Sequence, residues 1–372
     1  MRCQTNNKSS FIASIQVLRA IAVLIVVLVH LGTAEFYYLK GNHFLFPWCR
    51  AGNIGVDIFF VISGFIMVST TQSMSPGYST CVTFLTRRFI RIYPIYWGYC
   101  LLNVLQNYIF SLLSEKRPFE PRFLPLLKSF SLFPQVDLPL ILVSWSLTYE
   151  VWFYLVFGLL LFFKRSWLFG LLVIWLAFIV AGNTNNLAAA IGYNLANPGS
   201  TPIWNTVFGP LSAEFIMGCF IALLCLKIKP RKLPALILLL LASMAIAYSF
   251  YYAAIYGMGE GWRRILYCGL PSALLVASFV YGEKAGIIYP PKSLLFIGDA
   301  SYSIYLSHFM IIGDTFLLTH ITLSRLSIPL DNPILHIAAI LLALCACLVG
   351  GAVSYKYIEL PLTNTVRALI KR

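Results

Sequence analysis

Long apolar runs alternate with short polar segments along the whole chain. Each run is long enough, or nearly so, to cross the roughly 30 Å hydrocarbon core of a bilayer as a helix. Continuous apolar runs of this length are typical of membrane-spanning helices. The pattern therefore predicts an all-α polytopic membrane helix bundle of about ten transmembrane helices, near residues 12–31, 54–70, 89–113, 141–163, 167–181, 205–226, 233–254, 265–281, 294–319 and 333–357.

Composition supports this prediction and orients the bundle. Hydrophobic residues make up 59% of the 372 residues and charged residues 11%, with a mean hydropathy of +0.81. That leaves too few polar side chains to cover a soluble domain. The net charge of +14 does not indicate nucleic acid, because most Lys and Arg residues lie between the apolar runs. Short cytoplasmic loops are enriched in these residues, so both termini are predicted to be cytoplasmic.

The whole chain, residues 1–372, is predicted to form a single membrane-embedded domain. It has no evident linker or low-complexity tract. Its nine Cys residues are scattered, mostly within apolar runs, and their spacing indicates neither a disulfide framework nor a metal site.

Two ionisable residues interrupt the first apolar run. Arg19 and His30 are eleven residues apart in LRAIAVLIVVLVH. At about 100° and 1.5 Å per residue, they share one helix face at depths about 16 Å apart. They could be a snorkelling anchor and an interfacial residue. Alternatively, His30 titrates near neutral pH and can act as a general base on a hydroxyl.

Two carboxylates lie near the predicted outer ends of later runs. Asp57 lies in NIGVDIFFVISGFIM, and Glu150 lies in SWSLTYEVWFYL after Trp145. Asp57 could simply be a helix-start carboxylate that the helix dipole stabilises. A carboxylate buried among aromatic side chains is costly without a partner, so we expect Glu150 to pair with His30 and orient its imidazole.

The stretch RRFIRIYP, residues 87–94, enters the third run from the predicted cytoplasmic side. Arg91 follows Arg87 by four residues and Arg88 by three, so the three guanidinium groups can converge. They are either topology anchors or a phosphate clamp, a task that suits Arg better than Lys.

The last two runs carry weaker candidates. Tyr302, Tyr305 and His308, in SYSIYLSHFMI, lie on one broad helix face, either as core packing or as part of a site. Lys356 and Glu359 have the spacing of a local ion pair.

The Asn-rich segment 182–205 could suit a sugar, or it could simply form turns.

Together these stretches resemble the acyltransferase 3 family of integral membrane O-acyltransferases. The matching features are the R-x10-H pair, GVDIFFVISGF, RRFIRIYP, SWSLTYE and SYSIYLSHF, in the family's order over essentially the whole chain. The first two look closest to the branch that acetylates exopolysaccharides. No C-terminal esterase-like domain of the kind found in some members is expected, so the membrane domain is expected to complete the transfer.

The resemblance implies transfer of an acyl group, usually acetyl from cytoplasmic acetyl-CoA, to a hydroxyl of a surface polysaccharide or lipid-linked glycan. The RRFIRIYP stretch would then bind acetyl-CoA through Arg87, Arg88, Arg91 and Tyr93. The catalytic residues would be His30 as general base, Glu150 as its partner, and Arg19 as a group that steadies the donor or the oxyanion. Residues with a substrate-binding or structural role would be Asp57, Trp145, Tyr305 and His308.

Several alternatives stay open. The acceptor could be a small molecule, and the transfer could be direct or pass through an acyl-His30 intermediate. A non-enzymatic glycan or lipid flippase would also be a multi-helix membrane protein. A flippase is expected to have its polar residues near the midplane, often in repeated halves, whereas these candidates gather toward two surfaces. The expected location is a bacterial inner membrane.

Overall fold

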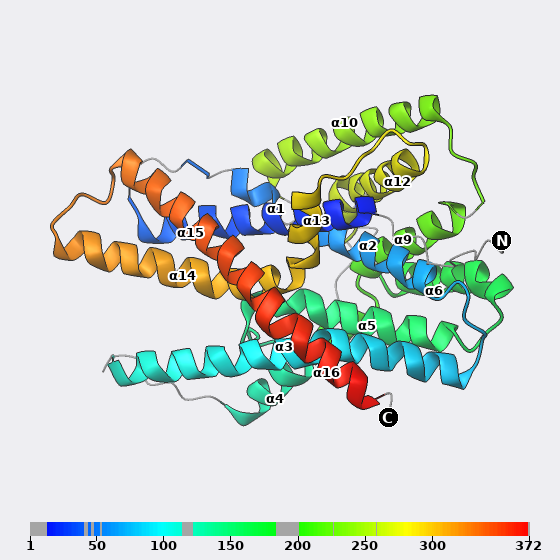
Figure 1. Ribbon diagram of the computed structural model, residues 1–372, viewed down its shortest axis with the longest axis horizontal. Helices are drawn as coiled ribbons and strands as arrows, with labels where there is room; N and C mark the ends of the chain where they lie inside the picture. Colours follow the sequence, from blue (N-terminus) through cyan, green and yellow to red (C-terminus); the bar gives the residue numbers. More distant parts are fainter. Residues whose placement is uncertain are drawn as a thin grey trace, which may run out of the picture.

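The computed structural model describes residues 13–40, 44–45, 48–52, 54–113, 122–183, 201–225, 227–257 and 259–370. Within these ranges the chain is helical and has no strand (Figure 1), which confirms the predicted all-α bundle. The α-helices are α1 (Ala13–Tyr38), α2 (Ile54–Thr70), α3 (Tyr78–Leu113), α4 (Phe123–Ser131), α5 (Trp145–Leu160), α6 (Leu168–Gly182), α8 (Pro202–Val207), α9 (Leu211–Cys225), α10 (Lys232–Tyr256), α11 (Gly261–Arg264), α12 (Leu270–Lys284), α13 (Lys292–Asp299), α14 (Ser301–Arg325), α15 (Pro333–Ser354) and α16 (Leu360–Ile370).

Each of the ten predicted runs contains helix, and eight described helical segments are long and apolar enough to cross a membrane. The α2 helix is apolar but has only 17 residues. The α3 helix has 36 residues and is not among the eight, because polar residues such as Asn103, Gln106 and Asn107 interrupt its apolar sequence. The protein is thus a multi-pass integral membrane protein.

The α1 helix lies at the centre of the bundle. It packs against α2, α12, α13, α14 and α15, and 67% of the residues in its apolar stretch are buried, against 17% in α10. Figure 1 shows α10 and α12 side by side at one edge of the bundle, while α3, α14 and α15 extend beyond the other helices at one end. A buried central helix such as α1 can therefore carry functional side chains, whereas a peripheral helix such as α10 faces lipid.

The closest helix contact joins α2 and α9 through two glycines. A Cβ on Gly64 would lie 1.9 Å from the carbonyl oxygen of Phe215, and a Cβ on Gly218 would lie 1.9 Å from that of Val61. Small residues allow such backbone contact where lipid removes the usual hydrophobic driving force. Gly64 is the glycine of GVDIFFVISGF, so this part of the motif serves helix packing.

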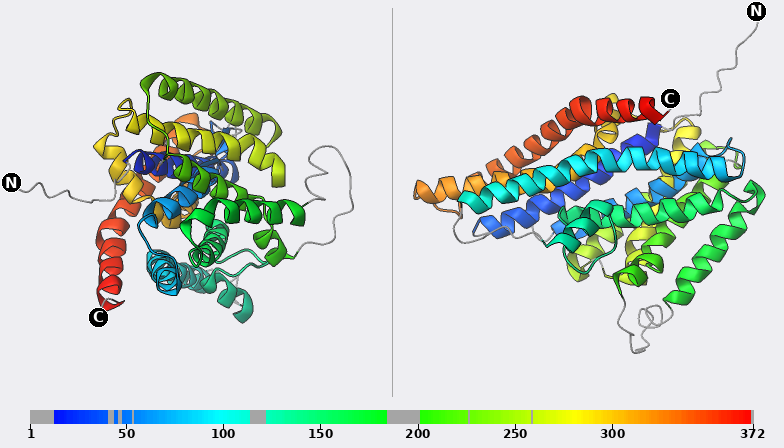
Figure 2. Two further views of the ribbon diagram at one scale, coloured as in Figure 1. Left: turned by 90° about the vertical axis from the view of Figure 1, so that its right-hand side faces the viewer. Right: turned by 90° about the horizontal axis from the view of Figure 1, so that it is seen from below.

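The start of α1 and the end of α16 lie at the same end of the bundle (Figure 2). The carboxylate of Glu283, near the end of α12, accepts hydrogen bonds from the backbone N–H groups of Ala13 and Ser14, at 3.0 and 2.7 Å. These are unpaired donors of the first turn of α1. The contact fixes α1 to α12 at this end.

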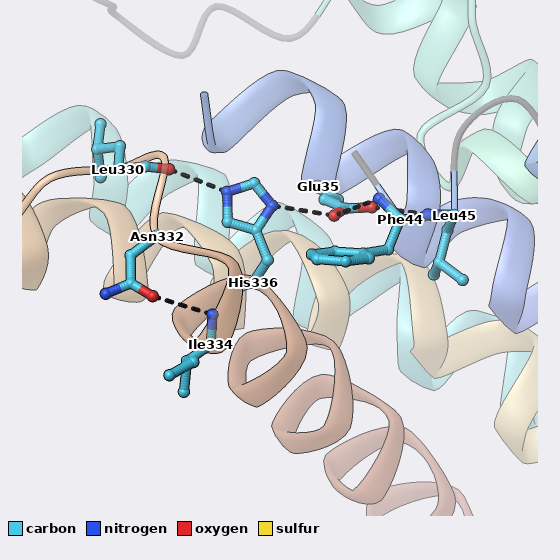
Figure 3. Close-up of polar contacts among 7 residues, drawn as sticks. All are labelled: Glu35, Phe44, Leu45, Leu330, Asn332, Ile334 and His336. Atoms are coloured by element: carbon cyan, nitrogen blue, oxygen red, sulfur yellow. Dashed lines mark hydrogen bonds and ion pairs between the residues drawn. The ribbon is translucent and has the colours of Figure 1, made fainter. Parts of the chain in front are cut away.

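A buried Glu35–His336 pair fixes α1 at its other end (Figure 3). The carboxylate of Glu35 accepts hydrogen bonds from the backbone N–H groups of Phe44 and Leu45 and lies 3.0 Å from Nδ1 of His336. The second ring nitrogen of His336 lies 3.0 Å from the carbonyl oxygen of Leu330. Both ring nitrogens face acceptors, so the pair joins α1 to the start of α15.

The predicted ion pair between Lys356 and Glu359 does not form. Residues Tyr355–Glu359 form a π-helical turn, which widens the α-helical spacing on which that prediction rests. Glu359 instead accepts a hydrogen bond from the Ser303 hydroxyl at 2.6 Å, and the Lys356 ammonium lies 5.3 Å from the centre of the Tyr357 ring.

Candidate active site

A narrow chamber of about 80 Å³ lies between α1, α2, α3, α5 and α14. It brings together five of the residues predicted from sequence, namely Arg19, Arg88, Arg91, Glu150 and Tyr305. Other polar side chains of its wall come from Ser63, Ser146, Tyr154, Ser301 and Tyr302. All five sequence motifs therefore meet at one cavity.

Two of the three arginines of RRFIRIYP reach the chamber. The Arg88 guanidinium lies 5.3 Å from the centre of the Phe84 ring and 5.6 Å from that of Tyr154, and it donates to the Thr70 hydroxyl at 3.3 Å. Its Nε is buried and has no hydrogen-bond partner among the described residues. Arg87 is exposed and does not line the chamber, so the expected convergence of three arginines is only partly right.

Arg19 is the third guanidinium of the chamber. It is only 8% exposed, and its side chain donates to Gln16 at 3.1 Å. Asp299 ends α13, outside the spanning helices. Burial raises the pKa of its carboxyl, and the charges of Arg19 and Arg91 offset this only in part. The chamber thus holds three cationic side chains with few carboxylates to balance them.

Glu150 does not pair with His30. One of its carboxylate oxygens accepts hydrogen bonds from the Tyr154 hydroxyl and, at 3.5 Å, from the Ser63 hydroxyl. Glu150 lies more than one turn inside α5, which directs it into the chamber beside the arginines. The expected carboxylate–imidazole pair is therefore corrected to a carboxylate among tyrosine, serine and arginine side chains.

His30 pairs instead with His308 of α14, which the sequence offered as a weaker candidate. Nε2 of His308 lies 3.2 Å from Nδ1 of His30, and that nitrogen also lies 2.9 Å from the carbonyl oxygen of Val26. Nδ1 of the fully buried His308 lies 2.6 Å from the carbonyl oxygen of Tyr305. Only one ring nitrogen of a neutral imidazole carries hydrogen.

The hydrogen-bond partners of His30 and His308 determine which ring nitrogen of each carries hydrogen. Nδ1 of His308 faces a carbonyl and carries the hydrogen, so its Nε2 accepts. Nδ1 of His30 therefore donates, toward Val26 and His308. Nε2 of His30 is left as an unprotonated acceptor with no partner among the described side chains, which is the state required of a general base.

Tyr305 lies between the chamber and the histidine pair. Its hydroxyl donates to the Val143 carbonyl at 3.0 Å and lies 2.8 Å from the Ser146 hydroxyl, while its ring centre is 5.6 Å from that of His308. His30 itself is not part of the chamber wall. The sequence motifs thus form two adjoining sites, a cationic chamber and a histidine pair.

Asp57 has a different partner from any considered in the sequence. The Arg264 guanidinium binds it through two hydrogen bonds, at 2.9 and 3.0 Å, and Asp57 is completely buried. Glu214 of α9 is completely buried beside it. Arg264 directly precedes a π-helical turn, Ile265–Gly269.

The two remaining candidates lie outside the chamber. The Tyr93 hydroxyl donates to the backbone carbonyl of Ser131 at 3.0 Å, so Tyr93 ties α3 to the end of α4. The Trp145 ring centre lies 5.6 Å from the Arg264 guanidinium, at the start of α5. Most of the Asn-rich segment, residues 184–200, falls outside the described residues.

Sequence reasoning missed Arg264, Ser63 and the role of Glu214. A signal was available for two of them: Glu214 is a single charge inside an apolar run, like Arg19, and Arg264 lies at the edge of one. Such charges in membrane segments are costly and usually functional or paired. Ser63 gave no comparable signal, because serine is common in membrane helices.

The fold and the site define a multi-pass membrane protein with a histidine pair beside a cationic chamber. Comparison with known proteins identifies the class. The model of the acyltransferase 3 family, described as an acyltransferase domain, matches residues 12–352, and the chain belongs to this family. It is therefore an acyltransferase that moves groups other than aminoacyl groups, and the flippase alternative is set aside.

Three relatives illustrate the range of the family. The chain is 30% identical over 338 residues to the exopolysaccharide production protein ExoZ of Rhizobium meliloti, covering 88% of this chain and 93% of that protein. It is 25% identical to the peptidoglycan O-acetyltransferase OatA of Listeria monocytogenes, covering 97% of this chain but 57% of OatA. It is 26% identical to the acyltransferase MdmB of Streptomyces mycarofaciens, covering 79% and 77%. No solved structure matches the chain.

Proposed function

We propose that the protein transfers an acetyl group from cytoplasmic acetyl-CoA to a hydroxyl of an exported polysaccharide or lipid-linked glycan, in a bacterial inner membrane. The observation that carries the proposal is the arrangement of the cationic chamber beside His30, whose Nε2 is free to accept a proton. The names of the exopolysaccharide and peptidoglycan relatives support a glycan acceptor.

The chamber suits the donor. Acetyl-CoA carries phosphates at one end and a thin pantetheine arm at the other. Arg88 and Arg91 can bind phosphate groups at the chamber entrance, since guanidinium groups form strong paired hydrogen bonds with phosphate. A volume of about 80 Å³ is too small for a nucleotide, so the nucleotide of the donor would stay at the entrance. Arg19 would then lie along the arm.

The chemistry is a single displacement. The acceptor hydroxyl oxygen attacks the thioester carbonyl carbon, and the carbon–sulfur bond breaks. Nε2 of His30 takes the hydroxyl proton and then gives it to the departing thiolate, so that free CoA and the O-acetyl ester result. His308 holds the reactive tautomer of His30, as the third member of a triad orients its base. Arg19, about 16 Å from His30 along α1, steadies the donor arm within the chamber.

The orientation follows from charge. Arg165 donates to the backbone carbonyl of Val68 near the end of α2, and Lys284 donates to that of Cys225 at the end of α9. Arg88 contacts Thr70 in the same region of α2. Clusters of Lys and Arg at one set of helix ends favour a cytoplasmic position for that side, which is where acetyl-CoA is available.

The test is acetyl-CoA turnover by the purified protein in detergent, followed as free CoA release with and without crude cell glycans. His30→Ala should lower glycan-dependent release by about 10²-fold or more. Arg88→Ala should raise the KM for acetyl-CoA by at least tenfold. The matched controls are His320→Ala and Arg122→Ala, at positions away from the chamber. Unchanged release in His30→Ala, or no acetyl-CoA binding by the wild type, would refute the proposal.

A further inference from the structure

A second cavity, a polar cleft of about 380 Å³, lies where α5 begins. Its walls are formed by residues 128–139, the first turns of α5, and α8, which follows more than 50 residues later. The cleft is more than four times as large as the chamber. It is large enough to hold a sugar ring.

An aromatic pair in the cleft is held rigidly. The Trp145 ring centre lies 5.6 Å from the Arg264 guanidinium. Asp57 in turn fixes this guanidinium through two hydrogen bonds. The Tyr149 ring lies nearly perpendicular to Trp145, with 6.3 Å between ring centres, and its hydroxyl donates to the backbone carbonyl of Asn205 at 3.1 Å. Gly209 makes room for this ring, since a Cβ there would lie 2.9 Å from Tyr149.

Polar groups around the aromatic pair are left without protein partners. The side-chain oxygen of Gln135 is buried and accepts no hydrogen bond from the described residues, although its nitrogen donates to Ser129 at 3.1 Å. The cleft wall also carries the Thr148 hydroxyl and the Asn205 amide, and neither pairs with another side chain in the described part of the protein. Rigid aromatic faces beside free amide and hydroxyl groups suit a sugar, because one face of the ring is apolar and its edge carries hydroxyls.

An apolar groove of about 650 Å³ continues from this cleft between α3 and α5. The two cavities share wall residues Leu132, Phe133, Pro134, Thr148 and Thr206. The groove in turn shares wall residues Arg88, Ile92 and Tyr154 with the chamber. Its walls include Phe89 and Leu155, which are 45% and 48% exposed on the lipid-facing surface of the bundle. The groove therefore borders both the cleft and the chamber and reaches the lipid-facing surface.

We propose that this continuous surface is the binding site for a lipid-linked acceptor, with its sugar in the Trp145 cleft and its hydrocarbon chain in the groove. The inference rests on the proposed function and makes it more specific: the glycan is modified while still attached to a lipid. A water-soluble polymer would use the cleft alone, whereas the groove gives a hydrocarbon chain a path from the bilayer to the reaction site.

Photolabelling tests the placement without requiring turnover. The full chain in lipid nanodiscs is illuminated with dodecyl glucoside that carries a diazirine either on the sugar or at the end of the chain, and adducts are mapped by mass spectrometry. The sugar probe should label residues 133–137, 145–149 or 205–206, and the chain probe residues 89–93 or 151–155. Gln135→Leu and Asn205→Ala should each lower sugar-probe labelling at least fivefold, while the control Asn107→Ala should not.

Two results would overturn the inference. One is labelling by the sugar probe elsewhere in the chain. The other is equal competition by dodecanol and dodecyl glucoside, which would show that bilayer lipid alone fills the groove. Labelling as expected in a protein without transferase activity would instead refute the proposed function. Transfer that is unaffected by Gln135→Leu, Asn205→Ala and a groove-filling Leu155→Trp would leave the function standing and refute the acceptor site.

Discussion

At the scale of single residues, the important feature is how each buried ionisable side chain is partnered. His30 and Asp57 both lie in apolar helices, where an unpaired polar group is costly. His30 is joined to His308, 278 residues away, and Asp57 to Arg264, 207 residues away. Each long-range pair fixes a helix as well as a charge. Loss of the His30–His308 pair should therefore affect catalysis, and loss of the Asp57–Arg264 pair should affect stability.

The histidine pair predicts a catalytic effect. His308→Ala removes the acceptor that faces Nδ1 of His30, so His30 should lose orientation while Val26 still holds it in part. We expect kcat to fall about tenfold or more, with the KM for acetyl-CoA unchanged. Steady-state CoA release measures both. His320→Ala on the same helix is the control, and a kcat equal to that of the wild type would assign His308 to packing alone.

The Asp57–Arg264 pair predicts a stability effect. Asp57→Asn leaves a largely buried guanidinium without its charge partner, and should lower the free energy of unfolding by about 3 kcal/mol. The exposed Arg122–Asp137 pair has the same chemistry, with side chains 78% and 47% exposed. Asp137→Asn should therefore cost at most about 1 kcal/mol. Thermal unfolding in detergent compares the two variants, and equal losses would contradict the expected effect of burial.

At the scale of helices, close packing through small residues sets the geometry of the bundle. Gly64 and Gly218 bring the α2 and α9 backbones into contact, which places Ser63 on α2 facing the chamber and Glu214 on α9 beside Asp57. A side chain at either glycine must push the helices apart, because the atoms it meets are backbone atoms and cannot rotate away.

Gly64→Ala should thus destabilise the protein, although alanine is the better helix former. The cost of overpacking is about 1–3 kcal/mol. Gly98→Ala is the matched control, because Gly98 also lies within a helix but a Cβ added there would meet no described atom within 4 Å. It should leave the melting temperature unchanged or raise it slightly. A Gly64→Ala variant as stable as Gly98→Ala would show that α2 and α9 tolerate separation.

Much of this architecture could be predicted from sequence, because long apolar runs need only local information. The convergence of Arg88 and Arg91 could likewise be predicted from their spacing, whereas their meeting with Arg19 at one chamber could not. Partner choice could not be predicted. Glu150 and His308 were both available to His30, and only helix rotation and packing decide between them. The π-helical turns that redirect Arg264 and Glu359 also have no simple sequence signal.

At the scale of the whole molecule, the bundle has two chemically distinct ends. Tyr289, in the segment between α12 and α13, is 82% exposed, and Val136, between α4 and α5, is 87% exposed. With cytoplasmic termini, Tyr289 lies inside the cell and Val136 outside. A membrane-impermeant maleimide should therefore label Val136→Cys in intact spheroplasts, and Tyr289→Cys only after permeabilisation, with the wild type as background. The reverse pattern would invert the proposed orientation.

The narrow chamber has a consequence for the energetics of the cell. A protein that gives a donor on one side access to an acceptor on the other risks leaking ions across the membrane. Here any such path runs through a cavity of about 80 Å³ past the guanidinium groups of Arg19, Arg88 and Arg91. Fixed positive charges in a constriction repel protons and metal cations. The residues proposed to bind the donor would therefore also insulate the membrane, so that acyl transfer need not discharge the proton gradient.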